Sequence, residues 1–496
     1  MIKVGFITNY FIFLFSKSKQ PPIRTLKKTV RWVIGIILGI YIGTIILLNI
    51  PYIQRNMTTF VTKELSRTLG TELTIGKIDI GLLNRIIIDD VLLDDQSGKE
   101  MLKITRLSAK FDIIPLFNGK ITISSVQLFG FNINLNKPAP HMEPNFKFVL
   151  DAFASKDTVK TKKDIDLRIN SILIRRGKLS YDVLSEEETP GKFNPQHIKL
   201  HNIIANISLK ALQNDSINAA IKRLSVDEQS GFELRKLSLK VIANNKGMKI
   251  ENFAIEMPGT EMKMDTIRME YDSLKALNHF ADNVRFSFRT LPSHVTLNDI
   301  SAFVPALSNF KEKLDLNIDV EGTLNQLNCR TLEINAGDKF RLKGDVSLQD
   351  LSRPQDAYVY GHLANLSANK EGIGFLVRNL SPHYNGVPPV LQHLGNTSFH
   401  GEISGYFTDL VMYGLFRTDI GSVQTDLKLS SDKAKALFSY SGGVKTTDFE
   451  LGQLLGNKQL GKITFNLDVR GNHYKSQYPS ITLKGLIASL EYSNYK

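Results

Sequence analysis

The stretch LDLNIDV, residues 314–320, alternates apolar and polar side chains at every position. A period of two places its four apolar side chains on one face of a β-strand and its acidic and amide side chains on the other. The same pattern occurs at residues 107–113, 129–135 and 463–469. The chain is therefore expected to contain many strands with one apolar and one solvated face.

Turn signals separate these strands. They are RRGK at 175–178, NNKG at 244–247, NAGD at 335–338 and SGG at 441–443. Glycine and asparagine at such positions favour tight turns. Because few segments are long enough for the helix of a parallel crossover, the pattern predicts a mainly β protein built as a long antiparallel meander.

A few helices are expected beside the strands. Residues 52–69 carry apolar side chains at helical spacing, and Gly70 follows as a C-terminal stop. Short helices are predicted within 297–310, where Pro305 should end or kink the helix, and near 449–455. A weak repeat aligns 394–405 with 460–471, which favours stacked units in an elongated body, although two strand segments can also match by chance.

An uncharged apolar stretch, residues 32–50, precedes the strands. Its nineteen residues match the roughly 30 Å hydrocarbon core of a bilayer. Basic residues are concentrated on its N-terminal side, which predicts a cytoplasmic N-terminus and an exported body. A cleavable signal peptide is the alternative, but its apolar region should be shorter and end at a small-residue cleavage site, whereas NIPY follows here.

Three glycines, Gly35, Gly39 and Gly43, recur every four residues in this stretch. They would form one stripe of a membrane helix and suit close packing against another helix. Glycine is also simply frequent in membrane helices, so the stripe has two interpretations of equal weight.

Composition excludes several classes of protein. With one cysteine, Cys329, the chain has no internal disulfide framework, and its 42% hydrophobic residues supply material for a core. The net charge of +13 is spread over polar strand positions, so attraction to anionic phospholipid is a better explanation than nucleic-acid binding.

Catalytic motifs are not recognisable in the sequence. It contains neither a Gly-x-Ser-x-Gly elbow nor a phosphate-binding Walker loop nor a zinc-type cluster. His197 and His201 flank a strand-like segment and have no glutamate between them, so they are not expected to form a metal site. We therefore expect no enzyme activity, no catalytic residue, no cofactor and no bound metal.

The order of several phrases resembles AsmA-like and TamB proteins, especially TamB homologues of Bacteroidota-type bacteria. The phrases lie at 60–80, 87–95, 123–135, 297–305, 401–410, 448–456 and 486–495. The similarity extends over nearly the whole chain from Pro51 onward. Relatives usually continue into a C-terminal domain associated with the outer membrane, so the chain is expected to be a truncated or split version.

The resemblance implies a cytoplasmic basic segment at 1–31, a transmembrane helix at 32–50, a linker helix at 51–70 and a periplasmic β-groove at 71–496. The groove would be taco-shaped or β-solenoid-like, with a few short helices. It implies a single-pass inner-membrane protein that carries phospholipid across the periplasm and assists outer-membrane protein assembly, with a BamA- or TamA-like β-barrel as a further partner.

Acyl chains would line the groove along the apolar members of three strand runs. These residues are Phe129, Phe131, Ile133, Leu135, Leu314, Leu316, Ile318, Val320, Ile463, Phe465, Leu467 and Val469. The competing interpretation is a structural scaffold of an envelope complex whose apolar face is a closed, dry core. Alternation alone does not separate the two, because both need one apolar face per strand.

Overall fold

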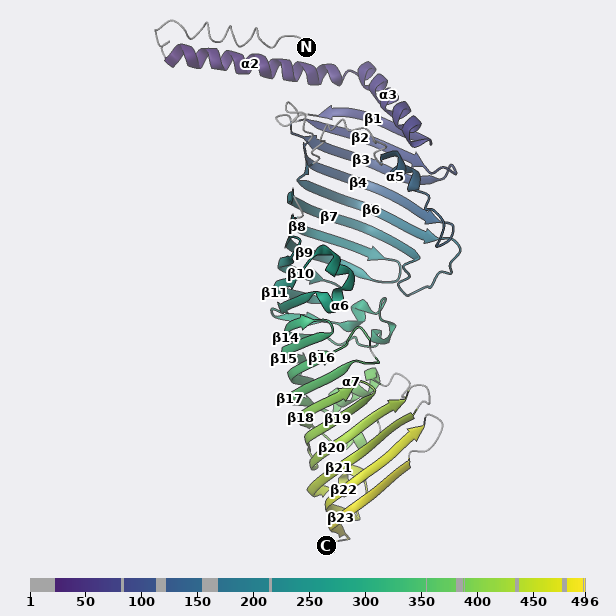
Figure 1. The fold of residues 1–496 in the computed structure, drawn as a ribbon, viewed down its shortest axis with the longest axis vertical. Helices are drawn as coiled ribbons and strands as arrows, with labels where there is room; N and C mark the ends of the chain where they lie inside the picture. The colour runs from purple at the N-terminus through teal and green to yellow at the C-terminus, as the bar shows by residue number, and fades with distance from the viewer. Residues whose placement is uncertain are drawn as a thin grey trace.

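A long sheet preceded by an apolar helix makes up the protein (Figure 1). The computed structural model describes residues 23–81, 84–112, 122–153, 168–213, 216–353, 355–380, 387, 389–432, 437–474, 480–493 and 495. Most of the basic segment expected at 1–31 lies outside this part of the chain. The C-terminal strands lie at the far end of an elongated body from the first helix, as Figure 1 shows.

The helical elements are α2 (Ile23–Leu48), α3 (Pro51–Leu69), α5 (Lys147–Phe153), η1 (Leu274–His279), α6 (Phe280–Asn283), η2 (Leu297–Ile300), η3 (Pro305–Leu307), α7 (Lys370–Leu380), α8 (Pro389–Gln392) and α9 (Leu451–Leu455). The strands of the N-terminal half are β1 (Leu73–Gly81), β2 (Arg85–Asp94), β3 (Glu100–Phe111), β4 (Thr122–Lys137), β5 (Arg168–Ile169), β6 (Ser171–Val183), β7 (His197–Gln213), β8 (Ser216–Glu228), β9 (Glu233–Ala243), β10 (Gly247–Glu256) and β11 (Glu261–Glu270). The remaining strands are β12 (Arg285–Arg289), β13 (Ser293–Val295), β14 (Leu314–Thr323), β15 (Gln326–Ala336), β16 (Phe340–Gln349), β17 (Tyr358–Ala368), β18 (Thr397–Tyr406), β19 (Asp409–Thr418), β20 (Gly421–Asp432), β21 (Leu437–Glu450), β22 (Leu460–Tyr474) and β23 (Ser480–Tyr492).

Strands pair almost entirely in chain order and antiparallel, as the meander prediction requires. The exception is β4, which pairs in parallel with β5 and β6 after a crossover that contains α5. Strands β12 and β13 share one place in the order, since both lie between β11 and β14. The chain is thus mainly β, with one sheet extending from β1 to β23.

The helix predictions are confirmed in outline. Helix α3 ends at Leu69, and Gly70 follows in the left-handed conformation with φ 66°. Around Pro305 the chain forms two short 3₁₀ turns, and this proline begins the second of them, so the prediction that it ends or kinks one helix is wrong. A proline at the first helical position loses no hydrogen bond. The two repeat segments both lead from a short helix, α8 or α9, into a strand.

Two of the four expected turns lie inside strands instead. The RRGK segment is the middle of β6 and the SGG segment is the middle of β21, whereas 244–247 and 335–338 do form turns. In β6, Arg176 has φ 55°, a left-handed value that a turn would also use. The glycine-containing sequence therefore indicated an irregular backbone correctly, but the irregularity lies within a strand and not in a turn between strands.

Left-handed residues form a row across the N-terminal part of the sheet. Asp90 in β2, Gly130 in β4, Arg176 in β6 and Asn202 in β7 have φ values of 55°, 60°, 55° and 53°. The strand register places the first three close to one another across neighbouring strands, with Thr105 of β3 between Asp90 and Gly130. Left-handed residues and bulges bend a strand and increase its twist. We call this row the crease.

The crease keeps one face of the sheet apolar. In β6 the residues on the apolar face are the even-numbered Ile172 and Ile174 before the crease and the odd-numbered Leu179 and Tyr181 after it. Of the four residues between Ile174 and Leu179, Arg175 and Arg176 are both exposed, Gly177 is buried and Lys178 is exposed. Two consecutive outward residues shift the alternation by one without turning the apolar set to solvent.

Helix α3 covers the open edge of β1. Ser66 accepts from the Leu73 amide and donates to its carbonyl, and Thr58 accepts from the Ile78 amide. Just before α3, the Asn49 side chain donates to the Ile80 carbonyl. A helix placed this way satisfies edge groups that would otherwise pair with another strand.

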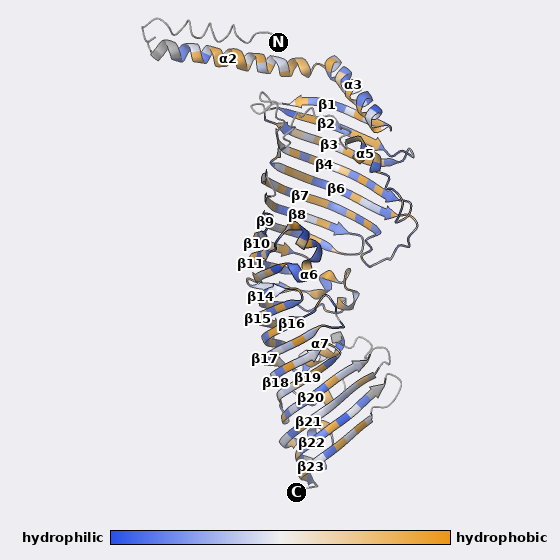
Figure 2. Cartoon of the chain, viewed as in Figure 1, coloured by the Kyte–Doolittle hydropathy of each residue, from blue (hydrophilic) through white to orange (hydrophobic). Residues whose placement is uncertain are grey.

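Cross-strand ion pairs cover the polar face. Arg289 bonds Asp319, Arg285 bonds Glu321, and Lys343 bonds Glu333. Figure 2 shows the corresponding alternation of hydrophilic and hydrophobic residues along the strands. In this face, hydrogen bonds from Lys240 and Lys249 lower the pKa of the Glu251 carboxyl to about 2.

The crease predicts a cost for a side chain at Gly130. A Cβ there would lie 2.7 Å from Thr105 Oγ1, and the left-handed φ disfavours any L side chain. We expect Gly130→Ala to lower the free energy of unfolding, measured by urea denaturation, by about 1–3 kcal/mol. Gly443→Ala is the control, because nothing lies within 4 Å of its Cβ position. Equal effects of the two substitutions would contradict the role of the crease.

Because α3 covers the edge of β1, we expect Thr58→Val to weaken the protection of a β1 backbone amide. Valine has the shape of threonine but leaves the buried Ile78 amide without its acceptor, which costs about 1–3 kcal/mol. Hydrogen exchange at the Ile78 amide should therefore accelerate by roughly tenfold or more. The neighbouring exposed Thr59→Val should leave this exchange rate unchanged; if it does not, α3 does not protect the edge through this hydrogen bond.

The lowered pKa of Glu251 predicts a contribution to acid stability. A carboxyl with a depressed folded pKa stabilises the fold above its ordinary pKa of 4.5, and this stabilisation is lost as the pH falls towards about 2. Glu251→Gln should flatten the dependence of thermal stability on pH in that interval. Glu270→Gln, at an exposed position at the end of β11, should not.

Candidate functional site: the apolar face of the sheet

The apolar face of the sheet is only partly covered by other parts of the protein. Along β14 and β15, Leu316 lies opposite Ile334 and Ile318 opposite Leu332, so these side chains share one face. On β22 and β23, Phe465 lies opposite Ile487 and Val469 opposite Leu483. The apolar strip thus recurs in strands far apart in the chain.

Eleven of the twelve expected lining residues have their side chains buried or half-buried within the sheet's apolar runs. The buried residues are Phe131, Leu314, Val320, Ile463 and Leu467. The half-buried ones are Ile133, Leu135, Leu316, Ile318, Phe465 and Val469. Half-burial of large apolar side chains in the middle of a sheet means that protein atoms cover this face incompletely.

Phe129 lies on the charged face. It is opposite Arg106 and Arg175, Arg106 is ion-paired with Asp89, and the Arg175 guanidinium lies 5.9 Å from the centre of the Phe129 ring. The neighbouring Gly130 is left-handed, so Phe129 and Phe131 do not share a face although they are two residues apart. The sequence pattern contained no sign of this change of face.

Short helices cover the apolar face mainly along one rim. We call this the helix rim; its connections contain α5, η2, η3, α7, α8 and α9. Near α5, a cluster forms around Leu73, Leu93 and Met101, with Phe148 packed against it. Corresponding clusters involve Phe375 of α7 over β14 to β16, and Leu451 of α9 over β21 and β22. At the opposite strand ends, η1 and α6 are the helical elements within the described ranges.

Neighbouring connections on the helix rim are hydrogen-bonded to one another. The Phe193 amide donates to the Ala302 carbonyl, and Asp299 accepts from the Gly259 amide. Phe193 also packs on Phe303, with ring centres 4.8 Å apart. The β6–β7, β10–β11 and β13–β14 connections of the helix rim are therefore joined to one another, whereas strands at the other rim are connected mainly by short turns.

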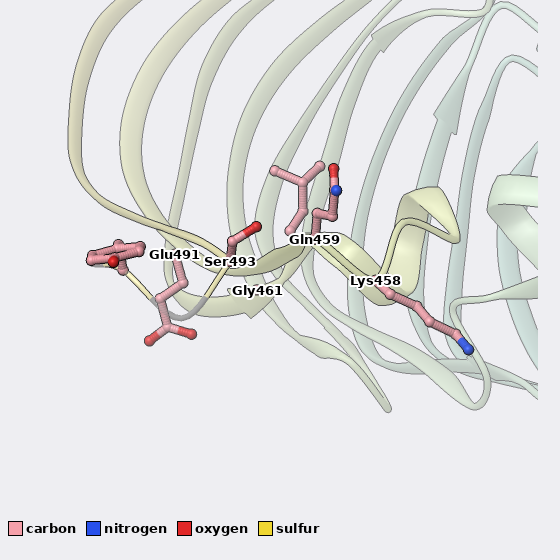
Figure 3. A pocket seen from close by; sticks show the side chains of 7 residues that line it. Lys458, Gln459, Gly461, Glu491 and Ser493 are labelled. Carbon is pink, nitrogen blue, oxygen red and sulfur yellow. The ribbon is translucent and has the colours of Figure 1, made fainter.

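One pocket lies near the C-terminal end of the sheet. The pocket in Figure 3 has a volume of about 330 Å³ and is lined by residues of the α9–β22 connection and of β23, including Lys458 and Glu491. The strands behind it run as nested arcs in Figure 3, so the sheet is curved.

The apolar helix α2 precedes this face. Its segment Lys27–Leu48 is long and apolar enough to cross a membrane, and Gly35, Gly39 and Gly43 lie on its exposed surface. The Tyr41 hydroxyl donates to the Asn84 side chain at 3.3 Å, which connects α2 to the turn between β1 and β2. The pairing of the three glycines with another helix remains a prediction.

Fold and site together define a class of protein: a single long curved β-sheet with one apolar face, preceded by a helix able to span a membrane. Comparison with protein-family models, curated proteins and solved structures finds no match for this chain.

Proposed function

We propose that the chain is an inner-membrane-anchored conduit for phospholipid in the bacterial envelope, and that acyl chains occupy the apolar face as a groove. The half-buried apolar strip along the sheet carries this proposal. A large apolar surface in water is unfavourable by roughly 25 cal/mol per Å². Acyl chains would remove that cost, while headgroups stayed in water at the rim opposite the helices.

The dimensions suit transfer over a distance. Neighbouring strands are about 4.8 Å apart, so the sheet from β1 to β23 has a length on the order of 100 Å. Movement along such a path needs weak and similar binding at every strand and no covalent chemistry. Accordingly, the proposed function is not enzymatic.

Position in the envelope is supported by charge and by resemblance. Lys27, Lys28 and Arg31 lie at the N-terminal end of the apolar helix, which favours a cytoplasmic N-terminus and a periplasmic sheet. Assistance to outer-membrane protein assembly, and a BamA- or TamA-like β-barrel as partner, rest on the likeness of the sequence to AsmA-like and TamB proteins.

The test is native mass spectrometry with lipid extraction on the full chain in mild detergent. Several phospholipids per chain are expected. Leu483→Glu places a charge on the apolar face at a residue that is 57% exposed, so folding should persist while bound phospholipid decreases. Thr482→Glu adds the same charge on the other face and should leave the lipid count unchanged.

A second variant examines the middle of the face. Ile318→Glu should reduce lipid binding further, and circular dichroism would show whether the sheet persists. A stable wild-type chain that carries no lipid would reject the conduit. The scaffold with a closed apolar core would then be the better explanation.

A further inference from the structure

Asp182, Glu188 and His197 form a compact group at the connection between β6 and β7. One potential ligand atom from each lies within 4.8 Å of the others. Asp182 comes from the end of β6, His197 begins β7, and Glu188 comes from the connection between them. Since His197 is only 5% exposed, its ring is held in place by the surrounding protein.

The two ring nitrogens of His197 each lie beside an oxygen atom. Its Nδ1 lies 3.0 Å from Asp182 Oδ1, and its Nε2 lies 3.0 Å from the Glu186 carbonyl oxygen. Both partners are acceptors, but a neutral imidazole has one N–H to donate. When that hydrogen is on Nε2 and bonds the Glu186 carbonyl, the Nδ1 lone pair faces the Asp182 carboxylate, and both atoms are placed to ligate one cation.

The surrounding charge is negative. Glu186, Glu187 and Glu188 are consecutive, and Asp182 lies beside them, while Lys199 contributes an ammonium 3.0 Å from Glu188. This ion pair lowers the pKa of the Glu188 carboxyl. One lysine does not neutralise the several carboxylates of this connection.

We propose that Asp182, Glu188 and His197 bind a divalent transition-metal ion of the zinc type, with His197 Nδ1 and one oxygen of each carboxylate as ligands. Histidine and carboxylate ligands lie about 2.0–2.2 Å from zinc, so the exposed Glu188 side chain moves inward on binding. The Nε2–H bond to the Glu186 carbonyl then fixes the ring, as backbone carbonyls commonly do for ligating histidines. Water completes the coordination.

The site would anchor a connection that belongs to the helix rim. Residues 184–196 leave β6, reach Ala302 through the Phe193 amide and return to β7 at His197. A metal at the base of this excursion ties its two ends and Glu188 together. The helix rim between β6 and η2 would thereby be held over the apolar face.

The experiment uses the full chain in detergent after chelation and dialysis, titrated with zinc sulfate alone. We expect one zinc per chain by calorimetry and elemental analysis. Glu188→Gln should weaken binding by at least about tenfold, because it removes a ligand. Glu187→Gln removes the same charge from the adjacent exposed residue and should leave the affinity nearly unchanged.

Lys199→Gln distinguishes a metal site from a simple ion-pair network. It removes the ammonium that competes for Glu188, so zinc should bind more tightly than to the wild-type chain. In an ion-pair network the same substitution would only loosen the connection. Cobalt in place of zinc should give visible absorption bands that Glu188→Gln alters and Glu187→Gln preserves.

Absence of stoichiometric zinc binding would overturn the proposal. Equal effects of Glu187→Gln and Glu188→Gln would also overturn it, since they would show attraction to the acidic loop alone. Both variants are at exposed positions, so folding does not limit the test.

Discussion

The structure depends on one constraint: successive strands must present most of their apolar side chains to the same side of a single sheet. In a regular strand this follows from alternation, because successive side chains point to opposite faces. These strands are long, and a bend interrupts the alternation in several of them. At the crease, left-handed residues such as Gly130 and Asn202 absorb the bend and restore the apolar phase. Curvature and a continuous apolar face therefore have one origin.

Much of this could be predicted from the sequence. The period of two at residues 314–320 and 463–469 gave correct strands, and α3 with its Gly70 stop follows from helical spacing and glycine chemistry. Such features depend on residues close together in the chain. The prediction that Phe129 and Phe131 share a face is wrong. Gly130 lies between them in the left-handed conformation, which glycine adopts easily, and this places the two side chains on opposite faces.

Features that depend on residues far apart in the chain do not follow from local sequence patterns. The parallel pairing of β4 with β6 is decided by how the crossover packs, not by the pattern within either strand. In sequence the histidine near His197 is His201, whereas in space the potential metal-binding groups near His197 are Asp182 and Glu188. The RRGK segment combines both effects. Its backbone is left-handed at Arg176, as in a turn, but pairing of β6 with β4 and β7 keeps the segment within the sheet.

The cover on β1 has a consequence for how copies of the chain behave beside one another. Proteins held in a membrane by a helix are confined to two dimensions, where encounters between neighbours are frequent. If α2 holds the chain in a membrane, as we propose, β1 would meet its counterparts on other chains repeatedly, and an uncovered edge would pair with them into extended sheets. Thr58 and Ser66 occupy those backbone groups before a neighbour can. Helix α3 thus blocks pairing between the edges of neighbouring sheets and also connects α2 to β1.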